Sequence, residues 1–170
     1  MIEVLSLPVS DRDLADLAAL LVDVVDGGAS TSFLPPLAPE RAAAWWRGAL
    51  SSEPAPLTLV VRDELGICAT VQLCPAWAPN QPHRAEIAKL LVHRRARRRG
   101  LGRALMDAVE ARAAAAGFTL LTLDTRRGDV ADGLYRALGW TVGGVIPGYA
   151  IDRHGVPHDT VYFYKQLPAR

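Results

Sequence analysis

One stretch constrains the fold of this chain more than any other: residues 86–103, which read EIAKLLVHRRARRRGLGR. The apolar run at 87–92 is typical of a strand that is buried on both faces. An arginine-rich turn follows it, and Gly-Leu-Gly then opens a helix with periodic apolar residues. A strand, a short turn and a helix in this order favour an α/β fold in which the turn lies at the carboxyl end of a strand.

The glycine-led turn has the features of a phosphate-binding loop. Gly100 and Gly102 let the backbone approach a ligand closely, and the first turn of a helix leaves N–H groups without intrahelical partners. The helix dipole favours an anion at the same point. Four nearby arginines add positive charge: Arg97, Arg98, Arg99 and Arg103. The turn therefore predicts a site for a phosphate-bearing ligand. A basic, solvated turn that only caps the helix is the alternative.

Spacing excludes two familiar classes of phosphate loop. The P-loop needs Lys-Ser/Thr after its last glycine, and the dinucleotide fingerprint needs a third glycine where Leu105 stands. Residues 97–102 instead fit the pattern Arg/Gln-x-x-Gly-x-Gly/Ala directly after a strand. In this respect the chain resembles the GNAT superfamily of acetyl-CoA-dependent N-acyltransferases, in which this loop holds the pyrophosphate of coenzyme A.

The resemblance continues beyond the loop. Residues 121–140, LTLDTRRGDVADGLYRALGW, are similar to the strand, helix and Tyr-x-x-x-Gly-aromatic pattern of the same superfamily, with Tyr135, Gly139 and Trp140 in place. Nearly the whole chain is most like the tabtoxin resistance group, through VDGGAS, HRAEIAKLLV, LDT, PGYA and VYFYK. Two departures are Arg94 in place of a frequent proline and Arg98 in place of a frequent glycine. If the backbone at position 98 has a positive φ, arginine is strained there.

The resemblance implies a fold of the α/β class with a mixed α+β sheet. This GNAT fold has six to seven strands, about four flanking helices and two parallel central strands that splay apart. Apolar periodicity and turn residues place helices between Ser10 and Gly27, at 40–50, at 100–116 and from Asp129 to Leu138; strands are expected at 2–7, 57–62, 67–73, 84–92, 119–123, 140–146 and 160–167. The segment 147–159 is expected to be a Gly- and Pro-containing loop.

Length and composition limit the remaining possibilities. With 170 residues, half of them hydrophobic, we expect one domain over residues 1–170. The net charge of +1 argues against nucleic acid or an anionic membrane as a partner. No apolar run approaches the roughly 20 residues of a membrane span, so a cytoplasmic location is expected. Cys68 and Cys74 lie in one predicted strand, too far apart for a disulfide, and the histidines have no ligand spacing, so no metal site is expected.

For the chemistry, the resemblance implies that Tyr135 is the general acid for the leaving thiolate. Glu86 and Asp124, which begin and end the two central strands, are the candidate bases. A carboxylate with a pKa near ~4 is a weak base for an ammonium near ~10, so a water relay or a raised carboxylate pKa is needed. The alternatives are a packing role for Tyr135, a cap or turn role for Asp124 and a plain surface charge at Glu86.

The binding residues follow from the same comparison. The backbone of Leu90, Leu91 and Val92 is expected to pair with the pantetheine arm of acetyl-CoA. The phosphates are assigned to Arg97, Arg98, Arg99, Gly100, Leu101, Gly102 and Arg103. Ser30 and Phe33, in the loop at 29–39, are expected to bind the acceptor, although their loop has a purely structural alternative.

The expected reaction is direct transfer of the acetyl group, in a ternary complex, to a primary amine of a small molecule such as a toxin, an antibiotic or an amino-acid-like compound. A protein N-terminus or lysine is the alternative acceptor. A third possibility, a protein that grips nucleic acid through its arginines, is disfavoured by the net charge. The chain is expected to be a monomer or a homodimer.

Overall fold

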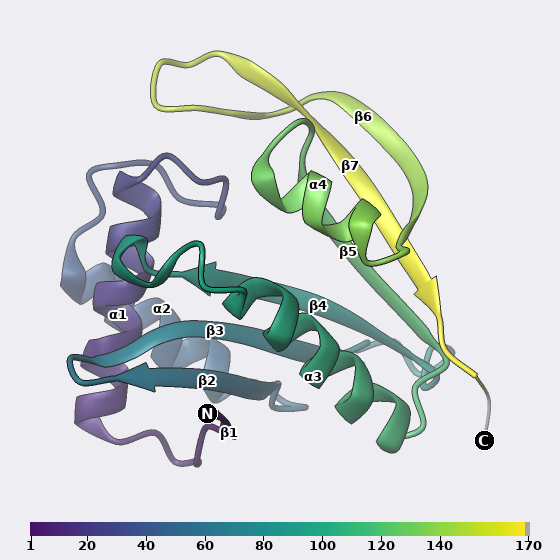
Figure 1. The fold of residues 1–170 in the computed structure, drawn as a ribbon, viewed down its shortest axis with the longest axis horizontal. Coiled ribbons are helices and arrows are strands. Elements are labelled where there is room, and N and C mark those ends of the chain that lie inside the picture. The colour runs from purple at the N-terminus through teal and green to yellow at the C-terminus, as the bar shows by residue number, and fades with distance from the viewer. Residues whose placement is uncertain (169–170) are drawn as a thin grey trace.

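The computed structural model describes residues 1–168, which form one mixed sheet with helices on both faces (Figure 1). The strands are β1 (Ile2–Val4), β2 (Leu57–Asp63), β3 (Gly66–Pro75), β4 (Arg84–Val92), β5 (Leu120–Arg126), β6 (Thr141–Ile151) and β7 (Pro157–Gln166), in the order β1-β2-β3-β4-β5-β7-β6. The helices are α1 (Asp11–Asp26), α2 (Pro39–Leu50), α3 (Leu101–Ala115) and α4 (Val130–Ala137), with a short 3-10 helix η1 (Arg94–Ala96). Seven strands and four α-helices confirm the predicted fold class.

Helices α1 and α2 cover one face of the sheet. Ser10 caps α1 as predicted, because its side-chain oxygen accepts a hydrogen bond from the backbone N–H of Asp13 at 3.1 Å. The apolar stripe of α1 is buried against the strands. On α2 the two neighbouring tryptophans separate: Trp46 is fully buried, whereas Trp45 is only partly covered and is available to line a surface feature.

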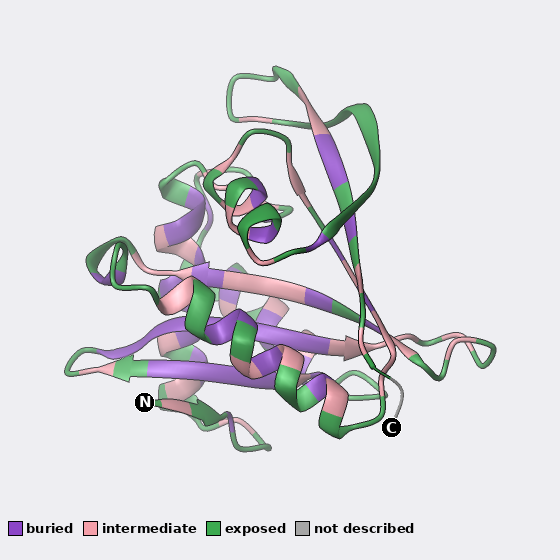
Figure 2. Ribbon diagram, turned by 45° about the vertical axis from the view of Figure 1, so that its right-hand side comes forward, coloured by how far each residue is buried: buried purple, intermediate pink, exposed green. Residues whose placement is uncertain are grey.

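Helices α3 and α4 cover the opposite face. Leu105, Val109 and Ala113 of α3 are fully buried against the strands, at the four-residue spacing read from the sequence. Tyr135 of α4 and Phe163 of β7 belong to the same apolar layer. Figure 2 shows this buried interior between the sheet and the helices, and shows β6 exposed along its whole length. None of the described helices is both long and apolar enough to cross a membrane.

The sheet splits at its centre. Strands β4 and β5 are parallel, but they pair only at Arg84 with Leu120, Ala85 with Leu121 and Glu86 with Thr122. Beyond this point the two strands diverge (Figure 1), while β4 stays paired with β3 as far as Val92. The edge of β4 that faces β5 is therefore free of strand pairing after Glu86. This confirms the predicted splay of the central strands.

A β-bulge interrupts β4 just after the split. Gln72 pairs with Ala88 and Thr70 pairs with Leu91, so Lys89 and Leu90 together oppose a single residue of β3. Lys89 has a φ of +50°, a left-handed conformation that is uncommon outside glycine. The extra residue changes which face of the sheet the following side chains meet.

The C-terminal hairpin corrects one expectation. The segment 147–159 was expected to be a loop, but β6 extends to Ile151 and β7 begins at Pro157, so only a short turn separates them. The irregular sequence is absorbed by register shifts between Val142 and Gly144 and between Ile146 and Ala150. Pairing with β7 therefore overrides the turn preference of Pro147 and Gly148. The first strand is also shorter than predicted, and ends at Val4.

Candidate active site

Two carboxylates lie where the sheet splits. Glu86 of β4 pairs with Thr122 of β5, and Asp124 lies two residues further along β5. Ala85 and Ile87 are buried in the layer of α3 and α4, as is Leu123, so alternation places Glu86 and Asp124 on the opposite face. The structure thus brings together the two candidate bases that the sequence analysis named.

The surroundings of these carboxylates change their acidity. Burial raises the pKa of Glu86 above its ordinary value, and the negative charge of Asp124 raises it further. Burial also raises the pKa of Asp124, while the positive charge of Lys89 opposes this. Both side chains nevertheless remain accessible at the surface, so a substrate can reach them. The geometry therefore supplies the raised carboxylate pKa that a proton acceptor at this point needs.

Tyr135 approaches the same point from the other face of the sheet. Its ring is buried on α4, with its centroid 6.1 Å from that of Trp140 and 5.8 Å from that of Phe163. Among residues 1–168 its hydroxyl has no hydrogen-bond partner. Burial raises the pKa of Tyr135, and the charge of Asp124 raises it further. The phenol therefore keeps its proton at neutral pH.

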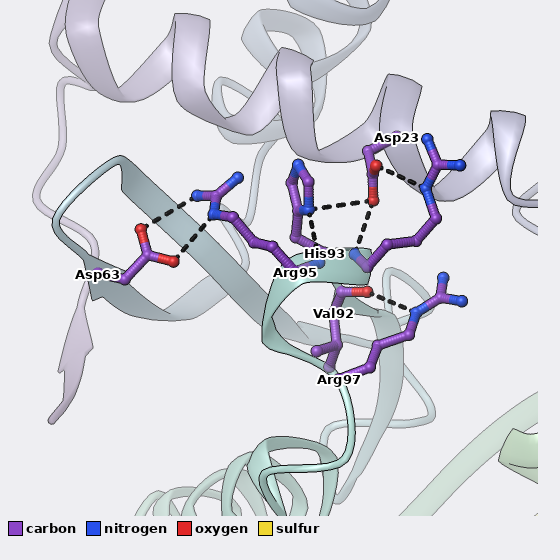
Figure 3. Close-up of polar contacts among 7 residues, drawn as sticks. Asp23, Asp63, Val92, His93, Arg95 and Arg97 are labelled. Carbon is purple, nitrogen blue, oxygen red and sulfur yellow. Dashed lines mark hydrogen bonds and ion pairs between the residues drawn. The ribbon is translucent and has the colours of Figure 1, made fainter.

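The arginine run after β4 divides into two groups. Arg94 and Arg95 hold the 3-10 helix in place: the backbone N–H and Nε of Arg94 donate to Asp23 of α1 at 2.9 and 2.8 Å, and Nε of Arg95 donates to Asp63 at 2.9 Å (Figure 3). The backbone N–H of Arg95 also donates to Nδ1 of His93 at 3.2 Å. These two guanidinium groups thus serve the fold.

The second group is available to a ligand. Arg98, Arg99 and Arg103 are exposed, and none of them has an ion pair or hydrogen bond in the described part of the chain. Arg98 has a φ of +61°, so the strain considered at this position is present, and Gly100 has a φ of +75°. Both left-handed residues lie in the turn before α3, which leaves the first N–H groups of that helix accessible. Arg97 differs, because its Nε donates to the backbone oxygen of Val92 at 3.2 Å (Figure 3).

The remaining predicted cofactor residues contribute through their backbone. Leu91 is buried, and Leu90, Val92 and Leu101 pack against the apolar layer, so their side chains are committed to the core. Gly102 is an ordinary helical residue, and a Cβ built there meets only Cδ2 of Leu134 on α4, at 3.4 Å. Packing of α3 on α4 alone therefore does not require glycine at position 102, because the Leu134 side chain could adjust to a Cβ there.

A pocket of about 320 Å³ opens on the face that carries Glu86 and Asp124. It lies between α2, β3 and β4 and is lined by residues that include Trp45, Glu53, Cys74, Trp77, Ala88 and Lys89. The ring of Phe33 packs edge-on against Trp45, with 5.7 Å between centroids, and so supports the pocket wall. Ser30 is exposed, and the structure records no hydrogen bond between it and Glu86, Asp124 or Tyr135.

The sequence analysis missed several residues around this opening. Lys89 is the single charged residue in the apolar run at 87–92, and this isolation could have identified it as a candidate site residue. Cys74 pairs with Glu86 across β3 and β4, and burial raises the pKa of its thiol to about 11. Tyr162 pairs with Asp124, and its hydroxyl donates to that of Tyr149 at 2.9 Å. That hydrogen bond, with burial, raises the pKa of Tyr162 to about 12.

Comparison with known proteins agrees with this geometry. Residues 28–140 match the Acetyltransferase (GNAT) family. An uncharacterized N-acetyltransferase in the hisH-hisA intergenic region of Azospirillum brasilense is 35% identical over 116 residues, which span 67% of this chain and 68% of the relative.

Solved structures share the fold. YncA, a putative acetyltransferase from Salmonella typhimurium with its cofactor acetyl-CoA, has a TM-score of 0.79 at 18% identity, covering 100% of this chain and 95% of its own. A GNAT superfamily phosphinothricin acetyltransferase from Sinorhizobium meliloti, in complex with acetyl-CoA, has a TM-score of 0.78 at 20% identity, covering 98% of this chain and 88% of its own. On the family match and the A. brasilense relative, the chain belongs to the GNAT family of acetyltransferases.

Proposed function

We propose that the protein transfers the acetyl group of acetyl-CoA directly to a primary amine of a small molecule, with both substrates bound at once. The observation that carries this proposal is the pair Glu86 and Asp124, two accessible carboxylates with raised pKa values at the split of the sheet and beside a walled pocket. Such a pair suits proton removal from an ammonium that is held against a thioester.

The chain offers a fitting site for acetyl-CoA. Three exposed arginines without partners among the described residues, Arg98, Arg99 and Arg103, surround the accessible start of α3, where phosphates bind well. The unpaired edge of β4 at residues 90–92 presents backbone groups to the amides of the pantetheine arm. YncA and the S. meliloti enzyme contain acetyl-CoA, which supports the same ligand here. When bound, it supplies the thioester.

The proposed roles follow from position. Glu86 or Asp124 accepts a proton from the acceptor ammonium, directly or through a water molecule. The neutral amine nitrogen then forms a bond to the thioester carbonyl carbon, the carbon–sulfur bond breaks, and the second proton on nitrogen passes to the departing thiolate, giving the amide and coenzyme A. Tyr135 donates a hydrogen bond to the departing sulfur. Since the pKa of Tyr135 is raised while a thiol titrates near ~8.5, this hydroxyl stabilises the thiolate more readily than it protonates it fully.

The size of the pocket, about 320 Å³, favours a small acceptor. Trp45 and Trp77 wall the pocket, and Arg153 in the β6–β7 turn donates to the backbone oxygen of Asp26 at 2.8 Å, so this turn reaches the end of α1. A protein N-terminus or lysine, the second candidate, needs an open groove. The likeness to the tabtoxin resistance group and to a phosphinothricin acetyltransferase supports toxin or antibiotic acceptors within the same proposal. We place Phe33 behind the acceptor and retain Ser30 as a candidate contact.

A thiol-release assay tests the proposal. The protein is incubated with acetyl-CoA and a panel of small amines, toxins and short peptides, and free coenzyme A is measured. We expect turnover with a small amine, and we expect Glu86→Gln combined with Asp124→Asn to abolish it while acetyl-CoA still raises the melting temperature. At a hundredfold excess over Kd this stabilisation is about 2.7 kcal/mol. Transfer to peptides alone, or no response to acetyl-CoA, would contradict the proposal.

A further inference from the structure

Lys89 is an ammonium group without a direct partner. In the described part of the chain, its Nζ makes no hydrogen bond and no ion pair within 4.0 Å. Its Nζ does make a cation–π contact with Trp45, at 4.8 Å from the ring centroid. Burial lowers the pKa of Lys89, while the charges of Cys74, Asp124 and Glu86 oppose this. A half-buried cation normally has an oxygen partner, so this one is poised to accept an anionic ligand.

The position of Lys89 relates the pocket to the chemistry. The bulge of β4 places its side chain among the pocket residues, three positions after Glu86 in the same strand. Trp45 and Trp77 also line this pocket and give it apolar surface. Neither carboxylate lines the pocket itself, but Cys74, which does, pairs with Glu86 on the neighbouring strand, so an acceptor in the pocket contacts Lys89 and lies next to the carboxylates.

We propose that Lys89 determines acceptor specificity by binding a carboxylate of the acceptor, whose amine then lies at Glu86 and Asp124 and whose apolar part lies against Trp45 and Trp77. The acceptor class is a free α-amino acid with an apolar side chain, or a compound with the same arrangement of groups. This inference rests on the proposed function and narrows its substrate class.

Two other roles for the pocket lead to different results. Glu53 also lines the pocket, so a diamine held by that carboxylate would be the competing acceptor. Lys89 could also act on Glu86 and Asp124 as a distant counterion, in which case its removal would affect every acceptor equally. Matched acceptors with and without a carboxylate separate these roles from substrate binding.

The experiment compares leucine, leucinamide and putrescine as acceptors. We expect the wild-type kcat/KM for leucine to exceed that for leucinamide, although the amide has the less basic amine. Lys89→Gln should lower kcat/KM for leucine by about 10- to 100-fold and leave the value for leucinamide within about twofold. Lys89→Arg should retain most of the preference. Arg47→Gln, which removes an exposed charge two residues from Trp45, is the matched control and should change neither value.

If Lys89→Gln lowered kcat/KM equally for leucine and leucinamide, or if the wild-type protein preferred putrescine, the assignment of Lys89 to the acceptor carboxylate would be overturned. Product binding supplies a readout that does not depend on turnover. In the presence of coenzyme A, calorimetry should show that N-acetyl-leucine binds about tenfold or more tightly than N-acetyl-leucinamide, and that Lys89→Gln removes this difference. If no amine is acetylated but this preference persists, the proposed reaction fails and the anion site stands. If turnover occurs without this preference for the carboxylate, the proposed reaction stands and the assignment of Lys89 as a carboxylate-binding residue fails.

Discussion

The strained turn before α3 gives a prediction that can be tested without a ligand. Arg98 has a φ of +61°, a region that is costly for any residue with a Cβ, and its side chain has no recorded partner among residues 1–168. Replacing it by glycine or by alanine removes the same guanidinium group. The two variants then differ in how well residue 98 accepts a left-handed backbone and in how much conformational freedom it loses on folding.

The expected difference in folding stability between Arg98→Gly and Arg98→Ala follows from two opposing contributions. A left-handed conformation costs a residue with a Cβ about 1–2 kcal/mol. Glycine loses about 0.5–1 kcal/mol more conformational freedom than alanine on folding. Arg98→Gly should therefore be more stable than Arg98→Ala by about 0.5–1 kcal/mol, which in a chain of this size corresponds to a melting temperature about 1–4 °C higher.

Thermal denaturation of the ligand-free variants, with urea unfolding as a second measure, tests this value. Gly100→Ala is a matched control in the same turn, because Gly100 has a φ of +75° and a Cβ there meets no atom within 4 Å. That substitution should destabilise the protein by a similar amount through conformation alone. Equal stability of Arg98→Gly and Arg98→Ala, together with a neutral Gly100→Ala, would refute the assignment of strain to this turn.

Four further predictions concern the site. Tyr135→Phe should lower kcat by about 10²- to 10⁴-fold in the thiol-release assay, with calorimetric acetyl-CoA affinity unchanged. Asp124→Asn removes the charge that raises the pKa of Glu86, so the acid limb of any residual kcat/KM profile should move to lower pH. Glu86→Gln should raise the melting temperature at neutral pH, because ionising a carboxyl whose folded pKa is raised opposes folding; this gain should vanish below about pH 4. Asp23→Asn should destabilise the protein by about 1–2 kcal/mol in urea unfolding, since Arg94 donates to both carboxylate oxygens of Asp23 and asparagine replaces one of them with an NH2 group that cannot accept.

The elements that the sequence predicted well are those with strong local signals. The first helix has a capping residue, a regular apolar stripe and a glycine stop, and each of these acts within a few residues of the chain. The turn before α3 combines Gly100 with a buried strand on one side and a periodic helix on the other, so its place in the fold was also predictable. In these regions local sequence signals determine the secondary structure, and tertiary contacts do not change it.

The hairpin of β6 and β7 shows where local reasoning fails. The segment 147–159 was expected to be a loop because of residues such as Pro147 and Gly148, yet β6 continues to Ile151, because backbone pairing with β7 stabilises it and register shifts accommodate the poor strand formers. The partner strand begins at Pro157, so the stabilising contacts are absent from any short window of sequence. The turn contact from Arg153 to Asp26, across more than a hundred residues, was likewise not predictable.

The candidate site was predicted in part, for a related reason. Tyr135 was named from a family resemblance, and Glu86 and Asp124 from their places at the ends of the two central strands; the structure brings the two carboxylates together at the split of the sheet. That arrangement needs the split between β4 and β5, which lets a phenol from one face act beside carboxylates on the other. Lys89 was missed because a bulge redirects it, and nothing in an apolar strand sequence indicates where an extra residue will be inserted.

Strained backbone offers a further argument for the location of the site. Among the described residues, the non-glycine positions with positive φ are Ser32, Lys89 and Arg98. They lie in the loop before α2, in the bulge of β4 and in the turn before α3, which are the three segments proposed to bind the acceptor, its carboxylate and the phosphates. Each conformation costs stability and persists only because surrounding contacts enforce it, and such residues cluster at ligand sites. The family resemblance had pointed to a positive φ at Arg98 but not at Ser32 or Lys89, so these two positions add separate support for the proposed site.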